Sequence, residues 1–238
     1  DDVSGFKKGD RVFGLTRFGG YAQFAVTQAQ AVSHLPEEAP IGTGCALATQ
    51  CVTAYHAAIL SQTLLPGEKV LIHAAAGGLG TALVQIALWK GCTVIGVAGG
   101  SEKVEYLKNL GVHHVVDHHR INWTDYVHQY LNGRVDVIFD NIGGSSIKKG
   151  KSVLAHGGRI VTLGAAALSG KKGKLNLIRL GLGFGFFSPI AYLSKSQSLI
   201  GVNMLKIADY RPDMLAESFK GVTTLHSKGI LNPHIGAI

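Results

Sequence analysis

The feature that most constrains the fold of this chain is a regular alternation of short apolar runs with helix-like segments. The apolar runs occupy residues 69–74, 92–98, 113–117, 135–140, 158–164 and 198–203. Amphipathic patterns typical of helices lie at about residues 78–90, 101–111, 123–133, 145–155 and 212–228. The runs are nearly continuous in Val, Ile and Leu, which is typical of strands covered on both faces. The alternation therefore predicts an α/β fold with a doubly wound, six-stranded parallel sheet.

A stretch with almost no side chains, "AAAGGLG" at residues 74–80, joins the first run to its helix. Ala75, Gly77 and Gly80 stand at the three positions of a G-x-G-x-x-G fingerprint. In such a turn Gly77 would let a pyrophosphate approach the backbone, and Gly80 would let helix and strand pack closely. The amino terminus of the following helix attracts negative charge. With six strands, this predicts a Rossmann sheet that binds a dinucleotide.

The residues after the second run indicate which dinucleotide is bound. An NAD enzyme usually places Asp or Glu there, whereas residues 97–103 read "VAGGSEK". Ser101 and Lys103 offer a hydroxyl and a cation, which favours the 2′-phosphate of NADP(H). Two alternatives stay open: Ser101 could cap the next helix with Glu102 complementing its dipole, or Glu102 could bind the ribose of NAD.

Histidine and cysteine invite a metal interpretation, which their spacing does not support. In "HHVVDHH", at residues 113–119, His113 and His114 would point to opposite faces of a strand. His118 follows that strand and could approach the adenosine end of a cofactor. The three cysteines, at positions 45, 51 and 92, form no CxxC pattern. We therefore predict no metal and no disulfide framework, and a cytoplasmic location.

Composition limits the partners of the chain. Of its 238 residues, 46% are hydrophobic and 16% are charged, which suits a folded domain. The net charge of +8 favours anionic partners. The lysine run "GKKGK" at residues 170–174 is accompanied by no RNA-binding motif, so a nucleic-acid partner is not expected. The nearly uncharged segment 175–193 contains one Arg, one Pro and several glycines, so we expect an apolar flap, a subunit interface or a lipid-facing surface rather than a membrane span.

Several motifs carry a family resemblance. "GEKVLIHAAAGGLGTALVQIA", with "GTGCALATQCVTAYHAAI" before it and "VDVIFDNIGG" and "GGRIVTLG" after it, resembles the medium-chain dehydrogenase/reductase superfamily in its zinc-free quinone oxidoreductase, or zeta-crystallin-like, branch. The tail is more similar to the VAT-1 subgroup. The resemblance implies part of a GroES-like catalytic domain at residues 1–44, a Rossmann domain at 45–229 and a return to the catalytic domain at 230–238. It also implies a longer parent protein with an active site between the two domains.

The resemblance also implies site residues. The matching positions are Gly77, Gly78, Leu79 and Gly80 at the pyrophosphate turn, Ser101, Lys103 and His118 around the 2′-phosphate, and Thr53, Asn141, Leu163 and Gly164 near the ribose and nicotinamide. A purely structural role is the alternative for two of them: Thr53 could bond to its own helix backbone, and Gly164 could simply form a turn.

The expected activity is a zinc-independent transfer of hydride from NADPH to a quinone or an α,β-unsaturated carbonyl. Such acceptors need little acid assistance, because their reduction places charge on an oxygen conjugated with the hydride-accepting centre. No catalytic acid is assigned; Tyr55 is the nearest candidate, and a core role is expected for it. The alternative is an NADPH-binding adaptor with RNA or peripheral-membrane association. The resemblance further implies a homodimer.

Overall fold

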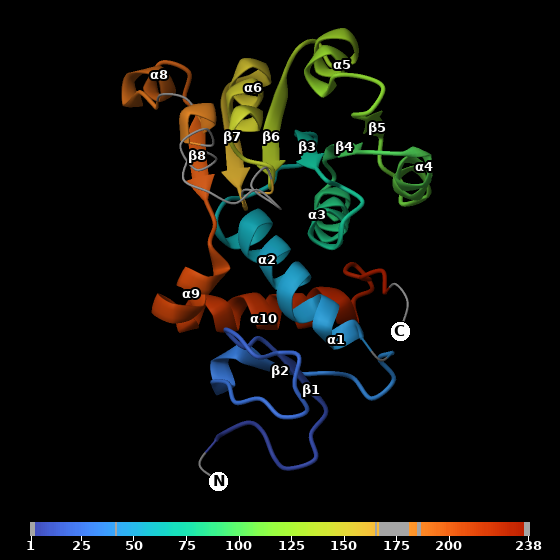
Figure 1. Cartoon of the computed structure of the whole chain (residues 1–238), viewed down its shortest axis with the longest axis vertical. Coiled ribbons are helices and arrows are strands. Elements are labelled where there is room, and N and C mark those ends of the chain that lie inside the picture. The colour runs from blue at the N-terminus through green and yellow to red at the C-terminus, as the bar shows by residue number, and fades with distance from the viewer. Residues whose placement is uncertain (1–2, 41, 165, 167–180, 185–186, 236–238) are drawn as a thin grey trace.

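The computed structural model describes residues 3–40, 42–164, 166, 181–184 and 187–235, and contains the predicted sheet (Figure 1). Its strands are β3 (Lys69–His73), β4 (Thr93–Ala98), β5 (His114–Asp117), β6 (Val135–Asp140), β7 (Leu154–Thr162) and β8 (Ser198–Gly201). All six are parallel, in the order β5-β4-β3-β6-β7-β8. The six-stranded Rossmann sheet is therefore confirmed, and all strands end at one carboxyl edge.

Helices cover both faces of this sheet. They are α3 (Gly78–Trp89), α4 (Ser101–Asn109), α5 (Trp123–Tyr130) and α6 (Ser145–Val153). Along β3, Val70 and Ile72 belong to the core on the α3 side, whereas Leu71 between them belongs to the core under α5 and α6. All three side chains are completely buried. This double burial explains the continuous apolar runs.

One strand begins earlier than the sequence predicts. β7 starts at Leu154 rather than near residue 158, and its register with β6 shifts between Val135 and Val137. Gly157 takes a φ of 76°, and a Cβ on Gly158 would lie 2.9 Å from the carbonyl oxygen of Asp136. The local irregularity of this "HGG" stretch hides the first part of the strand from pattern analysis.

Residues before the sheet form a small two-stranded unit and a long helical segment. β1 (Val12–Gly14) and β2 (Val32–His34) pair antiparallel, with the 3₁₀ turn η1 (Ala29–Ala31) between them. The helical segment then runs through α1 (Thr43–Ala46), η2 (Leu47–Cys51), α2 (Val52–Tyr55) and η3 (His56–Leu60), where η2 and η3 are π-helical. Figure 1 shows this segment between the carboxyl edge of the sheet and the β1–β2 unit.

Two helices after the sheet complete the lower half of Figure 1. They are α9 (Met204–Tyr210), which the sequence did not predict, and α10 (Pro212–Ser227), which it did. The Tyr55 ring lies directly over Gly221 of α10, where even a Cβ would overlap it. Tyr55 therefore packs between helices. Burial, with a smaller contribution from Glu217, raises the pKa of Tyr55.

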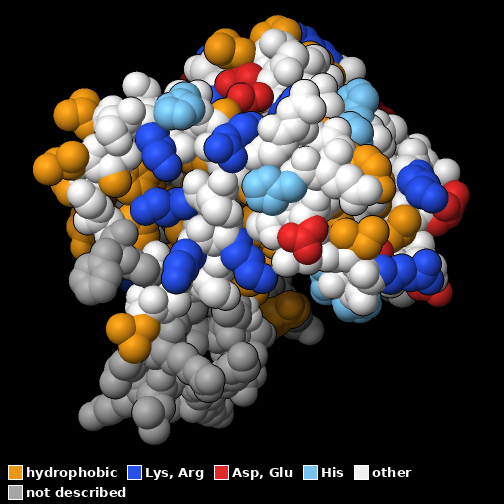
Figure 2. Space-filling model, turned by 90° about the horizontal axis from the view of Figure 1, so that it is seen from above, with side chains coloured by type: hydrophobic (Ala, Val, Ile, Leu, Met, Phe, Trp, Pro, Cys, Tyr) orange, Lys and Arg blue, Asp and Glu red, His pale blue; other side chains and the backbone are white. Residues whose placement is uncertain are grey.

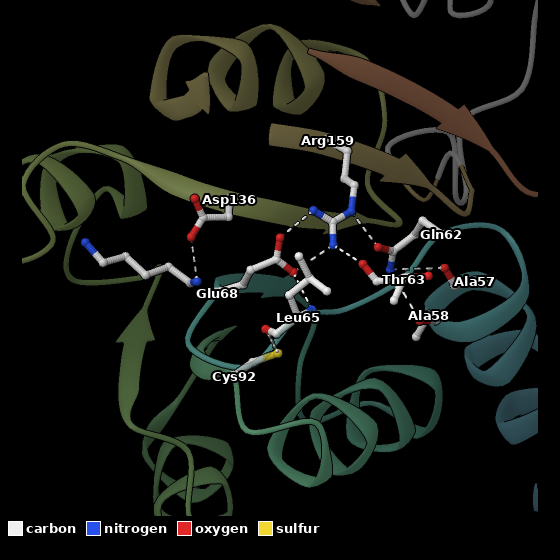
Figure 3. A network of polar contacts seen from close by, with 10 residues as sticks. Ala57, Ala58, Gln62, Thr63, Leu65, Glu68, Cys92, Asp136 and Arg159 are labelled. Atoms are coloured by element: carbon white, nitrogen blue, oxygen red, sulfur yellow. Dashed lines mark hydrogen bonds and ion pairs between the residues drawn. The ribbon is translucent and has the colours of Figure 1, made fainter. Parts of the chain in front are cut away.

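A polar network stabilises the amino edge of the sheet, which is opposite the carboxyl edge (Figure 3). Arg159 of β7 binds both carboxylate oxygens of Glu68 at 2.7 Å, the Gln62 side chain at 2.5 Å and the carbonyl oxygen of Thr63. The Leu65 backbone N–H also donates to Glu68, at 2.8 Å. The network ties the residues just after the long helical segment to the start of β3 and to Arg159 within β7.

Two expectations fall wholly or partly outside the described residues. The lysine run at 170–174 lies outside them, as do residues 175–180 and 185–186 of the apolar segment. The described remainder includes α8 (Pro189–Leu193), where Ile190 is 76% and Leu193 is 80% exposed. Within the described ranges, no helix combines the length and apolarity needed to cross a bilayer.

Candidate functional site

The predicted phosphate turn lies between β3 and α3 at the carboxyl edge. Ala74 has a left-handed φ of 49°, and the Gly77 N–H donates to the Ala74 carbonyl oxygen at 2.9 Å. Gly77 is the N-cap of α3 and provides no side-chain cap, which leaves the first amides of the helix available to an anion. A Cβ on Gly80 would overlap the Ala74 carbonyl oxygen and lie 2.7 Å from the Ala75 Cα. The strand and helix can approach this closely only because position 80 is glycine.

Beside this turn is a first cavity of about 250 Å³, which sequence analysis did not anticipate. Gln50 reaches into it from the π-helical η2 and lies over Gly78, where a Cβ would overlap the Gln50 side chain. Lys103 and Glu102 from α4 and His234 from the segment after α10 also line it. The sequence did not predict Gln50, because the direction of its side chain depends on the π-helical turn. Such turns are often found at functional sites.

A second, larger cavity of about 770 Å³ lies at the ends of β5 and β6. His118 lines it, and the His118 and His119 rings contact each other with centroids 4.5 Å apart. A Cβ on Gly99 would lie 2.7 Å from His118 Nε2. The two rings therefore occupy space that is open because residue 99 has no side chain. The structure therefore puts His118 and Lys103 in different cavities, although the sequence placed both around one phosphate.

The loop between β4 and α4 is held by an acid that the sequence analysis overlooked. Gly100, not Ser101, is the N-cap of α4, and Ser101 is the first residue of the helix. Asp117, at the end of β5, accepts hydrogen bonds from the backbone N–H groups of His119 at 3.0 Å and Gly100 at 3.3 Å. These hydrogen bonds, that from His119 first, lower the pKa of Asp117. The Asp117 carboxylate thus fixes the loop that leads into α4, the helix that carries Ser101 and Lys103.

Beneath the second cavity lies a buried polar group formed by adjacent strands. His73 ends β3 and Asp140 ends β6; His73 Nε2 lies 3.8 Å from Asp140 Oδ2 and 3.3 Å from the Ser146 hydroxyl. Burial lowers the pKa of His73 to about 4, against an opposing effect of Asp140. Asp140 Oδ1 accepts the Ile142 and Gly143 backbone N–H groups at 2.8 and 2.7 Å. A neutral imidazole and a carboxylate therefore support the turn after β6.

Three of the remaining predicted residues meet at a third cavity of about 680 Å³ at the ends of β7 and β8. Thr53, Leu163 and Gly164 line it together with Leu15, which follows β1, and residues from α9 and α10. Among its described lining residues, none carries an ionisable side chain. The Thr53 hydroxyl donates to the Thr49 carbonyl oxygen at 2.6 Å, which is the structural role that the sequence had left open.

Asn141 directly follows β6 at the carboxyl edge of the sheet and precedes Ile142, which lines the second cavity. Its side-chain oxygen is buried and has no hydrogen-bond partner among the described residues. Its backbone carbonyl oxygen accepts the Ala166 N–H at 3.0 Å, and a Cβ on Gly164 would lie 3.5 Å from the same oxygen. An unpaired buried amide is costly, so this position suits a polar ligand group.

Three side chains that invited a metal interpretation lie apart from one another. His113 accepts the Val94 backbone N–H at 3.1 Å while His114 contacts the Tyr126 hydroxyl at 3.1 Å, so the two point to different elements. Cys51 is buried, which raises the pKa of its thiol to about 12. Within the described part of the chain, no three His, Cys, Asp or Glu side chains converge on a point where a metal ion could bind.

The arrangement fits an extended dinucleotide. A glycine cradle lies at the amino terminus of α3, a large cavity with basic residues lies on one side along the edge, and an uncharged cavity lies on the other. Ligands of open α/β sheets bind outside the carboxyl ends of the strands, where these features lie. Gly77, Gly78, Leu79 and Gly80 would hold the pyrophosphate, and Asn141, Leu163 and Gly164 would border the path toward the third cavity.

Comparison with known proteins supports a specific family. Residues 78–219 match the family model described as "Zinc-binding dehydrogenase". Human quinone oxidoreductase is 34% identical over 86% of this chain and 58% of its own length. The human synaptic vesicle membrane protein VAT-1 homolog is 30% identical over 100% of this chain and 61% of its own. The chain thus spans about three fifths of the relatives that it matches.

Solved structures agree with the sequence matches. The CurK enoyl reductase superposes with a TM-score of 0.80 at 25% identity, covering 98% of this chain and 65% of that one. The quinone oxidoreductase of Escherichia coli, solved in complex with NADPH, gives a TM-score of 0.78 over 98% of this chain and 68% of that one. At 22% identity the latter shows the shared fold alone.

Proposed function

The chain belongs to the zinc-binding dehydrogenase family of the medium-chain dehydrogenases/reductases, with quinone oxidoreductase and VAT-1 homologues among its relatives, and from this premise we propose that it is the cofactor-binding part of an NADPH-dependent reductase. The reaction would pass a hydride to a quinone or an α,β-unsaturated carbonyl. No metal ion would take part. The acceptor class and the lack of zinc are those expected from the sequence.

The observation that carries this proposal is the uncharged third cavity. Bound NADPH would supply the hydride from C4 of its nicotinamide. Around the acceptor, the lining of Leu15, Thr53, Leu163 and Leu215 provides apolar surface and a hydroxyl that is already bonded within its helix. A site of this kind orients an acceptor and excludes water but offers no strong acid. Quinones and enones suit it because the negative charge from reduction is delocalised onto a conjugated oxygen, and the product can take up its proton once it reaches solvent.

Activity of the full-length protein tests the proposal. NADPH oxidation would be followed with ortho- and para-quinones and enones, with NADH in parallel and with EDTA-treated enzyme. We expect NADPH oxidation whose rate is the same with and without EDTA. Because Tyr55 packs on Gly221, Tyr55→Phe should leave kcat unchanged. A loss of turnover on chelation, or on Tyr55→Phe at unchanged stability, would contradict the proposal.

A second candidate is an NADPH-binding adaptor that associates peripherally with membranes. Its support is the VAT-1 similarity over the whole chain and a surface that combines apolar and basic side chains. Seen from above, Lys and Arg side chains gather beside apolar ones on the face formed around α5, α6 and α8 (Figure 2). Exposed Ile190 and Leu193 of α8 lie there, and Lys151 contacts the Tyr192 ring at 4.8 Å. Tight NADPH binding without turnover, together with sedimentation on anionic vesicles, would favour this candidate.

A further inference from the structure

Asn203 is a polar side chain at the third cavity, and a helix cap fixes its direction. It lies two residues after β8 and lines the cavity together with its neighbours Val202 and Met204. Asn203 is also the N-cap of α9, because its side chain accepts a hydrogen bond from the Lys206 N–H at 3.3 Å. An N–H donor must face an acceptor, so the atom that faces Lys206 is the amide oxygen Oδ1. The amide nitrogen Nδ2 is therefore the end of the side chain that remains for the cavity.

The backbone around Asn203 holds it in place as well. The Val202 N–H donates to the Thr162 carbonyl oxygen at 3.0 Å, which ties the residue before Asn203 to the end of β7. The backbone carbonyl oxygen of Asn203 accepts the Ile207 N–H at 3.0 Å. Both oxygens of Asn203 are thus used by α9, whereas no described residue accepts a hydrogen bond from Nδ2. The N–H groups of the amide are in position before any substrate binds.

The other polar side chains that line this cavity, among the described residues, are hydroxyls. The Thr53 hydroxyl already donates to the Thr49 carbonyl oxygen. Thr49 and Thr162 carry hydroxyls that rotate and can either donate or accept. A donor that is already oriented stabilises developing negative charge better than one that must reorient during the reaction. Asn203 is therefore the side chain of the cavity best suited to bind an oxyanion.

Resting on the reductase function proposed above, we propose that Asn203 is a catalytic residue whose Nδ2 donates a hydrogen bond to the acceptor oxygen that becomes negatively charged. In an enone, the hydride forms a C–H bond at the β-carbon, the electrons of the C=C bond shift toward the carbonyl, and the carbonyl oxygen takes the charge of an enolate. NADPH gives the hydride and is oxidised to NADP⁺, and water protonates the enolate after it leaves the site. In a quinone, the same donor would contact the oxygen of the hydroquinone anion. The amide keeps its own protons, so it stabilises the charge without acting as an acid.

Two substitutions keep the cap of α9 and remove the donor. Asp and Ser cap helices as well as Asn does. In Asn203→Asp an oxygen replaces Nδ2, and in Asn203→Ser the shorter hydroxyl serves the cap. Loss of one oxyanion donor slows a reaction by about 100-fold or more. Both variants of the full-length protein should therefore slow hydride transfer from NADPH to a quinone or enone by about that factor, as measured by stopped-flow absorbance in single turnovers.

The melting temperature and the Kd for NADPH should be unchanged in both variants, because the cap is retained. Asn132→Asp is the matched control for the chemical change. Asn132 lies in the turn before β6, at the amino edge of the sheet, and its φ of 57° suits Asp as well as Asn. This variant should transfer hydride at the wild-type rate.

A second readout needs no hydride transfer. The probe is 4-nitrophenolate, whose delocalised oxyanion resembles that of the reduced acceptor and whose absorbance reports binding to the NADP⁺ complex. Because a hydrogen bond to a charged group contributes a factor of about ten or more to affinity, Asn203→Ser should weaken the binding of this probe by that factor. Asn132→Asp should bind it as the wild-type protein does.

Two results would overturn the inference. One is hydride transfer at the wild-type rate in Asn203→Ser, even where Asn203→Asp is slow, because the added charge alone would then explain the loss. The other is unchanged affinity for 4-nitrophenolate in Asn203→Ser. The proposed function fails in a different way: a wild-type protein that binds NADPH but oxidises it with no acceptor would refute the reductase together with this catalytic role. Turnover that survives the loss of Asn203 would refute only the role of Asn203.

Discussion

At the phosphate turn, the absence of a side chain at Gly80 decides how closely β3 and α3 approach each other. A methyl group there would overlap the Ala74 carbonyl oxygen, and backbone atoms cannot rotate away as a side chain can. Overpacking of this kind costs about 1–3 kcal/mol. The turn therefore depends on glycine for a reason of packing as well as of phosphate access.

We accordingly expect Gly80→Ala to lower the free energy of unfolding, measured by urea denaturation, by about 1–3 kcal/mol. It should also weaken NADPH binding, since the first turn of α3 would shift. Gly181→Ala is the matched control: residues 181–184 form a helical turn, and a Cβ on Gly181 meets no atom of the described part of the chain within 4 Å. At the control position alanine should be neutral or stabilising, since its helix propensity exceeds that of glycine by up to about 1 kcal/mol. Equal effects at both positions would show that the contact with Ala74 is unimportant.

His73 predicts a pH dependence of stability. Its pKa is about 4 in the folded chain, with burial as the main cause, Asp140 opposing and His118 reinforcing the shift. An unfolded histidine has a pKa of about 6.5, so the unfolded state takes up the proton first as the pH falls. Stability should therefore be complete above about pH 6.5 and decline by about 3 kcal/mol toward pH 4.

The measurement is the urea midpoint between pH 7 and pH 4 for the wild-type protein and His73→Gln. The variant should be less stable at pH 7, because Ser146 and Asp140 lose their partner, but its stability should fall less on acidification. Parallel pH profiles in the two proteins would mean that another group causes the acid sensitivity. Far-UV circular dichroism at each pH verifies that both proteins remain folded.

Among the elements, the polar network at the amino edge makes the stability of the sheet depend on the Arg159–Glu68 ion pair. Burial by itself raises the pKa of Glu68, but the hydrogen bonds from Arg159 and Leu65 and the charge of Arg159 outweigh it and lower the pKa. The ion-paired side chains are only 14% and 15% exposed. A pair this buried is costly to break, because the remaining partner keeps an uncompensated charge.

Arg159→Met should therefore lower the free energy of unfolding by about 3 kcal/mol at pH 7. The stabilisation from Glu68 is present above its unfolded pKa of about 4.3 and is lost as the pH falls through the lower folded value. The variant should consequently differ least from the wild-type protein in acid. Arg211→Met is the control, since the Arg211–Asp213 pair is 56% and 64% exposed and should have little effect. A difference that persists unchanged at pH 2 would exclude the ion pair as the cause.

The sequence predicts elements well where the pattern is local and poorly where contacts are distant. All six strands were predicted, because burial on both faces produces continuous apolar runs. The early start of β7 was missed, since Gly157 and Gly158 interrupt its pattern. The separation of Lys103 from His118 was also missed, because it depends on the path of the loop through Gly99. The His73–Asp140 pair had a signal: both residues end apolar runs, and Ile72 pairs with Phe139, but strand order is needed to recognise it.

At the scale of the whole molecule, the three cavities follow one edge of the sheet, with the second at the ends of β5 and β6 and the third at the ends of β7 and β8. The β1–β2 unit and the long helical segment contribute Leu15 and Thr53 to the third cavity, so that cavity needs elements from outside the sheet. A cofactor that contacts both ends of this edge would add contacts between the sheet and the elements outside it. Cofactor binding should therefore stabilise the molecule as a whole.

We expect NADPH to raise the melting temperature by more than either of its halves does. At a free concentration of about 100 Kd, a ligand specific for the folded state adds about 2.7 kcal/mol, and each kcal/mol raises Tm by about 2–4 °C in a domain of this size. At equal millimolar concentrations, 2′,5′-ADP should give a smaller shift and reduced nicotinamide mononucleotide the smallest, because linking the two halves makes the second contact intramolecular. Differential scanning calorimetry at matched ionic strength measures these shifts. If NADPH gave no larger shift than 2′,5′-ADP, the nicotinamide half would not engage the third cavity, and the uncharged cavity would lose its role as the site of hydride transfer.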